Sequence, residues 1–269
     1  MNMNILKLAF AVALIAAMPF TASADVMAIH DGDVRITGDL DDLPGGGNAG
    51  DENGGNTLLV VGVNTGNVQN WALFGFDTSA GAGEVATGAE LVLDMNLLTN
   101  GNHGDASNTF GIHELYSGNL GWVEGGGGIQ NSAMNVSAPG LVTFQQRAFD
   151  GGTGNGIDWV DGAGTALPNF IGSFDPAEIN TNTVNGWENG TLPNPTITFE
   201  FDATTAQSWL DNGRADLVLE VNDPDGMNTS RFVIQNGAVN ALTVFTVPEP
   251  SAALLLLGGL AAVVLRRRR

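Results

Sequence analysis

The sequence lacks cysteine altogether, and its 269 residues include one lysine, one tyrosine and three histidines. These absences exclude disulfides, thiol chemistry and zinc sites built on thiolates, so core packing must hold the fold. No metalloprotease helix motif, nucleophile-elbow serine motif or phosphate-binding loop is present. We therefore expect a protein that is not an enzyme. A polysaccharide hydrolase or lyase stays an alternative, because such enzymes need only two facing carboxylates.

The first 24 residues have the composition of a secretory signal peptide. Lys7 precedes an apolar run at 8–20, and the small residues Ala22 and Ala24 follow with the spacing of a signal-peptidase site. We expect cleavage after Ala24 and export of the chain through the inner membrane.

The last 23 residues, 247–269, form a second distinct segment. A Pro-Glu-Pro turn is followed by an apolar run and a basic block, which comprise Pro248, Glu249 and Pro250, the run 252–265, and Arg266, Arg267, Arg268 and Arg269. A helix over the run would be about 21 Å long, short of a hydrocarbon core of about 30 Å. The 19 residues counted from Val247 just span it if the bilayer thins or the arginines snorkel. The run is predicted to be a transmembrane helix, and the arginines favour a cytoplasmic end.

This order of turn, helix and basic block resembles the PEP-CTERM sorting tail of Gram-negative bacteria. The resemblance implies that an exosortase, a membrane protease, cuts at or near the Pro-Glu-Pro motif. It further implies a transient membrane anchor, a final place at the cell surface or outside the cell, and a link to exopolysaccharide. A plain membrane anchor is the alternative, and it would not need Pro248 or Pro250.

The segment between the two ends is strongly acidic. Five of the nine basic residues and one of the 29 acidic residues lie in the ends, which leaves four cations against 28 anions and a net charge of −24. Such a surface repels nucleic acid and anionic lipid, so we expect neither as a partner. It attracts divalent cations.

Residues 25–246 are predicted to fold as one all-β domain, a β-sandwich of the jelly-roll kind with long loops. The signals are short alternating or continuous apolar runs between turns rich in Gly, Asn and Asp, and one short helix at 204–211. The clearest expected strands are 25–36, 57–63, 71–76, 89–95, 110–116, 196–201, 217–221, 231–235 and 242–247. The stretch 117–195 is the least regular, and we expect short strands and long loops there.

This layout resembles the DNRLRE-type jelly-roll domain, which is related to a carbohydrate-binding module family of bacterial surface proteins. The resemblance rests on a strand ending in Phe76-Asp77 and on the segments 89–93, 121–124, 205–210, 217–219 and 230–232. The family's Arg-rich stretch before the Phe-Asp strand is replaced here by Asn70-Trp71-Ala72, and the region 125–194 is longer than expected. The resemblance implies a jelly-roll fold and a carbohydrate ligand, and the departures bear more on the ligand than on the fold.

Two acidic segments are candidate calcium sites, because Ca²⁺ takes six to eight oxygen ligands from a flexible loop. The first contains Asp31, Asp33, Asp39 and Asp41, and the second contains Asn222, Asp223 and Asp225. The second lacks the bidentate glutamate of a complete calcium loop. A solvated acidic turn is the alternative at both places, so no cofactor is certain and any calcium would be structural. A calcium-dependent adhesive scaffold is accordingly the alternative to a structural or carbohydrate-binding role in exopolysaccharide.

Three tryptophans in loop-rich sequence are candidate carbohydrate-binding residues: Trp122, Trp159 and Trp187. Flat aromatic rings stack on sugar faces, and nearby carboxylates and amides bind hydroxyls. The alternative is that these rings are core residues or fix loops. A sugar-binding role requires that they lie exposed on one face. Trp71 and Trp209 are assigned to the core.

Overall fold

The computed structural model describes residues 25–39, 58–64, 68–96, 109–123, 142, 146–148, 156–168, 170–183, 196–222, 231–235 and 240–248. The expected signal peptide and the expected transmembrane helix at 252–265 lie outside these ranges. Within them, no helix is long and apolar enough to cross a membrane.

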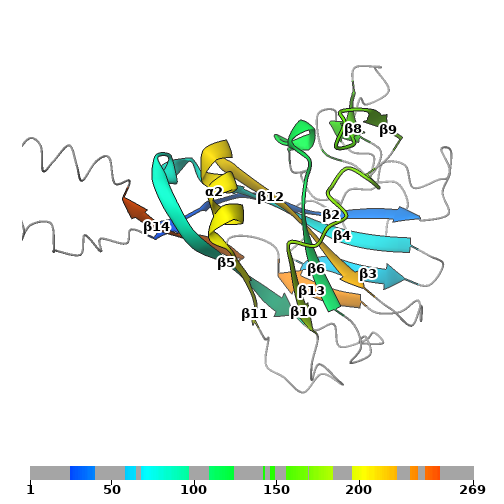
Figure 1. The fold of residues 1–269 in the computed structure, drawn as a ribbon. Coiled ribbons are helices and arrows are strands. Elements are labelled where there is room, and N and C mark those ends of the chain that lie inside the picture. Colours follow the sequence, from blue (N-terminus) through cyan, green and yellow to red (C-terminus); the bar gives the residue numbers. More distant parts are fainter. Residues whose placement is uncertain are drawn as a thin grey trace, which may run out of the picture.

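One antiparallel layer is built around the long strand β5 (Glu84–Asn96) (Figure 1). Strand β14 (Ala241–Pro248) pairs with one edge of β5 and β11 (Thr196–Phe201) with the other, and the short β1 (Val26–Met27) pairs with β14. In β11 the side chains alternate between exposed and buried, as the strict alternation of its sequence predicts.

A second antiparallel layer surrounds β4 (Val68–Asp77), which pairs with β2, β12 and β3. Strand β6 continues this layer from β12, β10 pairs with β6, and β13 pairs with β3. Because β13 also pairs with the end of β5, the two layers are joined along one line of hydrogen bonds. The bounds are β2 (Ile29–Asp39), β3 (Leu58–Asn64), β6 (Thr109–Glu114), β10 (Asn180–Thr183), β12 (Arg214–Asn222) and β13 (Arg231–Gln235).

The main core lies between the two layers. It includes Leu91 and Phe199 from the first layer and Phe74, Phe110 and Leu217 from the second, all 0 or 1% exposed. The all-β sandwich expected from the sequence is thus confirmed at the level of strands and packed sheets, and the jelly-roll connectivity stays a prediction.

A second core covers the outer face of the β4–β12 layer. Trp71, Leu73 and Val218 point away from the main core and pack against Trp122, Trp159 and other apolar residues of the segment 115–174, including Leu115, Val142 and Phe170. A small sheet of β7 (Gln146–Ala148), β8 (Ile157–Val160) and β9 (Ala166–Leu167) belongs to this cover. Burial on both faces explains why the sequence of β4 is continuously apolar at 71–74.

The helix α2 (Ala203–Asn212) closes one end of the main core with Ala206, Trp209 and Leu210. Asp202 begins it, because its carboxylate accepts a hydrogen bond from the Thr205 N–H at 2.8 Å. Gly213 ends it in the left-handed conformation, with φ of 67°. The helix expected at 204–211 and the core positions of Trp71 and Trp209 are confirmed.

Gly213→Ala should lower the free energy of unfolding by about 1 kcal/mol, because a Cβ is disfavoured in the left-handed region. The nearest heavy atom to that Cβ would be Ser79 Cβ at 3.7 Å, an ordinary contact, so the cost is a backbone cost. Gly213→Asn should cost less, since asparagine tolerates this conformation. Urea unfolding measures both changes, and equal stability of the alanine variant and wild type would contradict the expectation.

Candidate functional site

A polar pocket of about 260 Å³ opens where α2 ends and β12 begins. Its other wall is the chain that leaves β6 through the short helix η2 (Ser117–Asn119). The lining combines carboxylates, hydroxyls, an amide, a guanidinium and an indole, from Glu114, Tyr116, Ser117, Asp175, Ser208, Trp209, Asn212, Arg214 and Asp216, together with Leu115 and Leu120.

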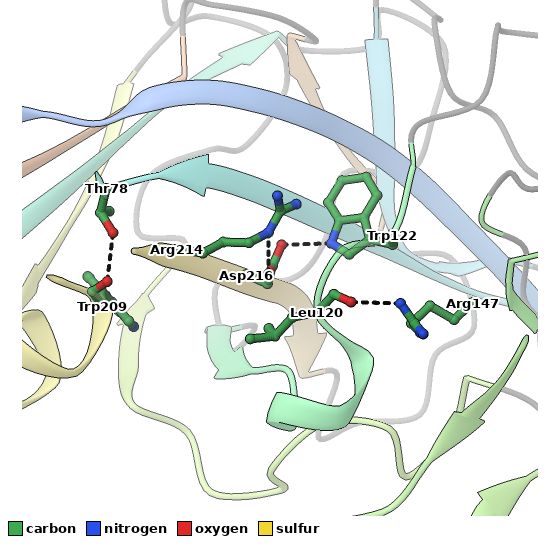
Figure 2. Close-up of polar contacts among 7 residues, drawn as sticks. All are labelled: Thr78, Leu120, Trp122, Arg147, Trp209, Arg214 and Asp216. Atoms are coloured by element: carbon green, nitrogen blue, oxygen red, sulfur yellow. Dashed lines mark hydrogen bonds and ion pairs between the residues drawn. The ribbon is translucent and has the colours of Figure 1, made fainter. Parts of the chain in front are cut away.

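Asp216 is the buried charge at the base of this pocket, and its side chain is 0% exposed. Its Oδ1 accepts a hydrogen bond from Trp122 Nε1 at 2.7 Å, and its Oδ2 accepts one from Arg214 Nε at 2.6 Å. Figure 2 shows the carboxylate between the two donors. The Arg214 guanidinium also lies 5.9 Å from the centroid of the Trp122 ring. These contacts hold the Asp216 carboxylate and the Arg214 guanidinium in place.

Hydrogen bonds also hold the other elements that line the pocket, helix α2 and the segment 114–120. Trp209 Nε1 donates to Glu114 Oε1 at 2.5 Å. Buried Asn119 donates to the carbonyl oxygens of Val160 and Ser173 at 2.8 and 2.6 Å, and it accepts from the Val160 N–H at 2.9 Å. Arg147 Nη1 donates to the Leu120 carbonyl at 2.7 Å (Figure 2). These hydrogen bonds join the segment 114–120, which lines the pocket, to the loop-rich cover.

A second polar group lies on the same outer face of the layer, around His113 and Glu220. The His113 Nδ1–H donates to the Asp175 carbonyl, 3.0 Å away, and Nε2 lies 3.5 Å from Glu220 Oε2. Burial raises the pKa of Glu220 above its ordinary value, opposed by attraction to His113 and a hydrogen bond from Trp71, while Glu178 raises it further.

Because burial favours neutral Glu220 in the folded protein, the fold retains that proton to higher pH than the unfolded chain does. The resulting stabilisation is complete below the unfolded pKa, near 4.5, and is lost as the pH rises through the raised folded pKa. Glu220→Gln should therefore gain stability relative to wild type as the pH rises from below the unfolded pKa, near 4.5, through the raised folded pKa, by at most about 1.4 kcal/mol per pH unit. Melting temperatures across that range test this. The exposed Glu200→Gln is the control, and parallel curves for wild type and Glu220→Gln would contradict the expectation.

Trp122 and Trp159 lack the exposure that a sugar-stacking role requires, and the alternative, that these rings are core residues, is the one that the structure shows. Trp122 is 5% exposed and Trp159 is 0% exposed, and both pack in the second core. Trp159 meets Phe170 edge to face, with ring centroids 5.0 Å apart. Their sequence surroundings indicate loops because the sheet residues they pack against, Trp71, Leu73 and Val218, are far away in sequence. Trp187 lies outside the described residues.

The two predicted calcium segments are only partly described. Asp31, Asp33 and Asp39 belong to β2 and not to a loop, and Asp31 lies at a register shift between His30 and Gly32. Asn222 is the last residue of β12, while Asp41, Asp223 and Asp225 lie outside the described ranges. In the part of the chain that the structure describes, no three His, Asp or Glu side chains gather as a metal site would need. A structural calcium stays a prediction.

Sequence reasoning missed Arg214, Asp216 and Glu114 as site residues. A signal existed: Asp216 and Glu220 interrupt the apolar residues of β12, a strand buried on both faces, where an unpaired charge would be costly. Their partners, however, lie far away in the chain: Trp122 is 94 positions from Asp216, and the partner of Glu220 is His113.

Comparison with protein families finds a match to the PEP-CTERM protein-sorting motif at residues 246–269. No curated protein matches the chain. The match covers Pro248, Glu249, Pro250 and the four terminal arginines, which confirms the resemblance of the tail. The chain is therefore an exported all-β protein with a C-terminal sorting signal, a substrate for exosortase processing.

Proposed function

We propose that the processed protein is a non-catalytic, carbohydrate-binding component of the cell surface or extracellular matrix, and that the pocket beside Asp216 holds a unit of exopolysaccharide. The observation that carries the proposal is the pocket's mixed polar lining, fixed in place by internal hydrogen bonds. The tail supports export and processing, and the carbohydrate role rests on the pocket.

The lining suits a sugar because a hydroxyl group both donates and accepts hydrogen bonds. Asp175 and Asn212 are exposed at the rim, and Tyr116 is half-buried beside them. These groups supply acceptors, an amide donor and one flat aromatic ring. The volume of about 260 Å³ is near the lower end of small-molecule sites, which matches one or two sugar rings better than a long chain segment.

The negative charge of the exported segment favours neutral over acidic polysaccharides as ligands. With 28 acidic residues against four arginines in the exported segment, a polyanionic glycan would be repelled over most of the surface. Arg214, the cation in the pocket, is already paired with Asp216. We therefore expect a neutral polymer.

The test is thermal unfolding and calorimetric titration of residues 25–248 with neutral polysaccharides such as dextran and with the acidic polysaccharide alginate. A ligand at about 100 times its dissociation constant should add about 2.7 kcal/mol of stability. Tyr116→Ala and Asn212→Ala should each weaken binding at least about tenfold, on the scale of losing one good polar or stacking contact.

The matched control is Thr204→Ala, which changes an exposed residue of the same helix outside the pocket. It should bind like wild type. No stabilisation by any neutral polysaccharide, or unchanged binding by both pocket variants, would contradict the proposed site.

A further inference from the structure

The sorting signal and the folded domain share residues. The sorting motif begins at Thr246, and β14 continues to Pro248, so Thr246, Val247 and Pro248 belong to both. The sequence-based boundary between domain and tail, after residue 246, thus falls inside a β-strand. No linker separates the last strand from the Pro-Glu-Pro motif.

The shared residues are held in the sheet. Thr246 pairs with Ala86, Val247 with Val85 and Pro248 with Glu84. Thr246 is 0% exposed, and Leu242 and Val244, earlier in the same strand, belong to the main core. Proline has no N–H to donate to a ladder, so Pro248 suits the last position of the strand.

The segment of β5 that receives this end of β14 is itself fixed by helix α2. On that segment, the Ala86 N–H donates to Gln207 Oε1 at 2.8 Å, and Gln207 Nε2 donates to the Glu84 carbonyl at 3.3 Å. Strand β11 pairs with β5 only from Ala89 onward, so Gln207 takes the place of a neighbouring strand beside residues 84–86. The segment of β5 that pairs with the end of β14 is therefore anchored to the helix.

The other end of the exported chain lies beside it. Val26 pairs with Val244 and Met27 with Thr243 in antiparallel register, so β1 begins at the end of the sheet where β14 finishes (Figure 1). Val26 is 9% exposed, and it packs close to Gly81. The two expected processing points, after Ala24 and near Pro248, therefore adjoin the same corner of the domain.

We propose that the folded domain sets the upstream limit of exosortase processing, so that the cleaved bond lies on the C-terminal side of Pro248 and the mature chain keeps all of β14. A protease takes its substrate as an extended segment freed from other pairing, and residues before Pro248 are already paired with β5. In the cleavage, water adds to the carbonyl carbon of the bond, the C–N bond breaks, and the tail leaves with the new amino group.

The test uses the full chain, produced in a Gram-negative host whose exosortase processes PEP-CTERM tails. Intact-mass spectrometry of the processed protein gives its C-terminal residue. The expected product ends at Pro248 or beyond it. A product that ends at Val247 or earlier, in a protein whose circular dichroism shows a folded domain, would overturn the proposal.

Two variants test whether the fold or the Pro-Glu-Pro motif determines the position of the cleaved bond. Gly-Ser-Gly-Ser inserted between Val247 and Pro248 moves the motif away from the sheet, and products that end within the insert are then expected. If the product instead ends at the same bond of the motif as in wild type, the motif alone sets the cut and the proposal is wrong.

The second variant, Gln207→Leu, removes the side chain that anchors the receiving segment of β5. It should produce a measurable fraction of chains that end between Val244 and Val247, where wild type gives none. Thr204→Ala, on the same helix, is the control and should give the wild-type product. A product from Gln207→Leu identical to wild type would show that the anchoring of β14 does not limit the protease.

Discussion

Asp216→Ala should lower the free energy of unfolding by about 3–5 kcal/mol, the range for breaking one side of a buried ion pair. The substitution leaves the Trp122 indole N–H and the Arg214 guanidinium without the carboxylate that each now contacts at 2.7 and 2.6 Å. Asp216 itself is fully buried, so water does not readily take its place. For a domain of this size the melting temperature should fall by about 10 °C.

Urea unfolding and calorimetry of the exported segment measure this change. Asp158→Ala is the control, because Asp158 is an exposed acidic residue of β8 and surface substitutions usually change stability by less than about 0.5 kcal/mol. A loss for Asp216→Ala no larger than that of the control would contradict the buried pair. Asp216→Asn should lie between them, since an amide keeps the shape and one acceptor but loses the charge.

Trp159→Ala should cost about 3–5 kcal/mol, because it removes the largest fully buried side chain of the described residues from the second core. The ring fills the space between the loop-rich cover and the β4–β12 layer, against Phe170. Its removal should detach the cover before it unfolds the main core, because Phe74, Leu217 and their neighbours lie on the other side of the sheet.

Hydrogen exchange distinguishes these two parts. Amides of β8 and of the segment 170–174 should lose protection in Trp159→Ala, while those of β5 and β11 should retain it. Ile157→Ala, two residues away on the same strand and 47% exposed in wild type, is the control and should change little. If Trp159→Ala instead kept its stability and bound polysaccharide more weakly, the core assignment would be wrong and Trp159 would be a carbohydrate-binding residue.

The strands that sequence predicted well are those whose pattern depends only on their own residues. Thr196–Phe201 alternates because one face is buried, and the run at 71–76 is continuously apolar because both faces are covered. The helix at Ala203–Asn212 carries its own signals, Asp202 at the start and Gly213 at the end.

The second core and the pocket could not be predicted in the same way. Trp122, Trp159 and Phe170 sit in sequence without periodicity, and they become a core only because β4 presents Trp71 and Leu73 to them. The Asp216 contacts likewise join residues far apart in the chain, so only the presence of a charge in an apolar strand hinted at a partner. Local patterns indicate which residues are buried, but long-range pairing decides what they are buried against.

Because β1 and β14 are adjacent, the fold does not require the chain to begin at β1 and end at β14. Since the first strand starts beside the point where the last one stops, a short peptide could join the two and the chain could be opened elsewhere, as circular permutation exploits in other proteins. The exposed turn at Ala82 and Gly83, between β4 and β5, offers such a position. A permuted domain that begins at Gly83 would keep both of its cores, and a tail fused after Ala82 would still leave from the same corner, because Gly81 lies close to Val26 and Glu84 pairs with Pro248.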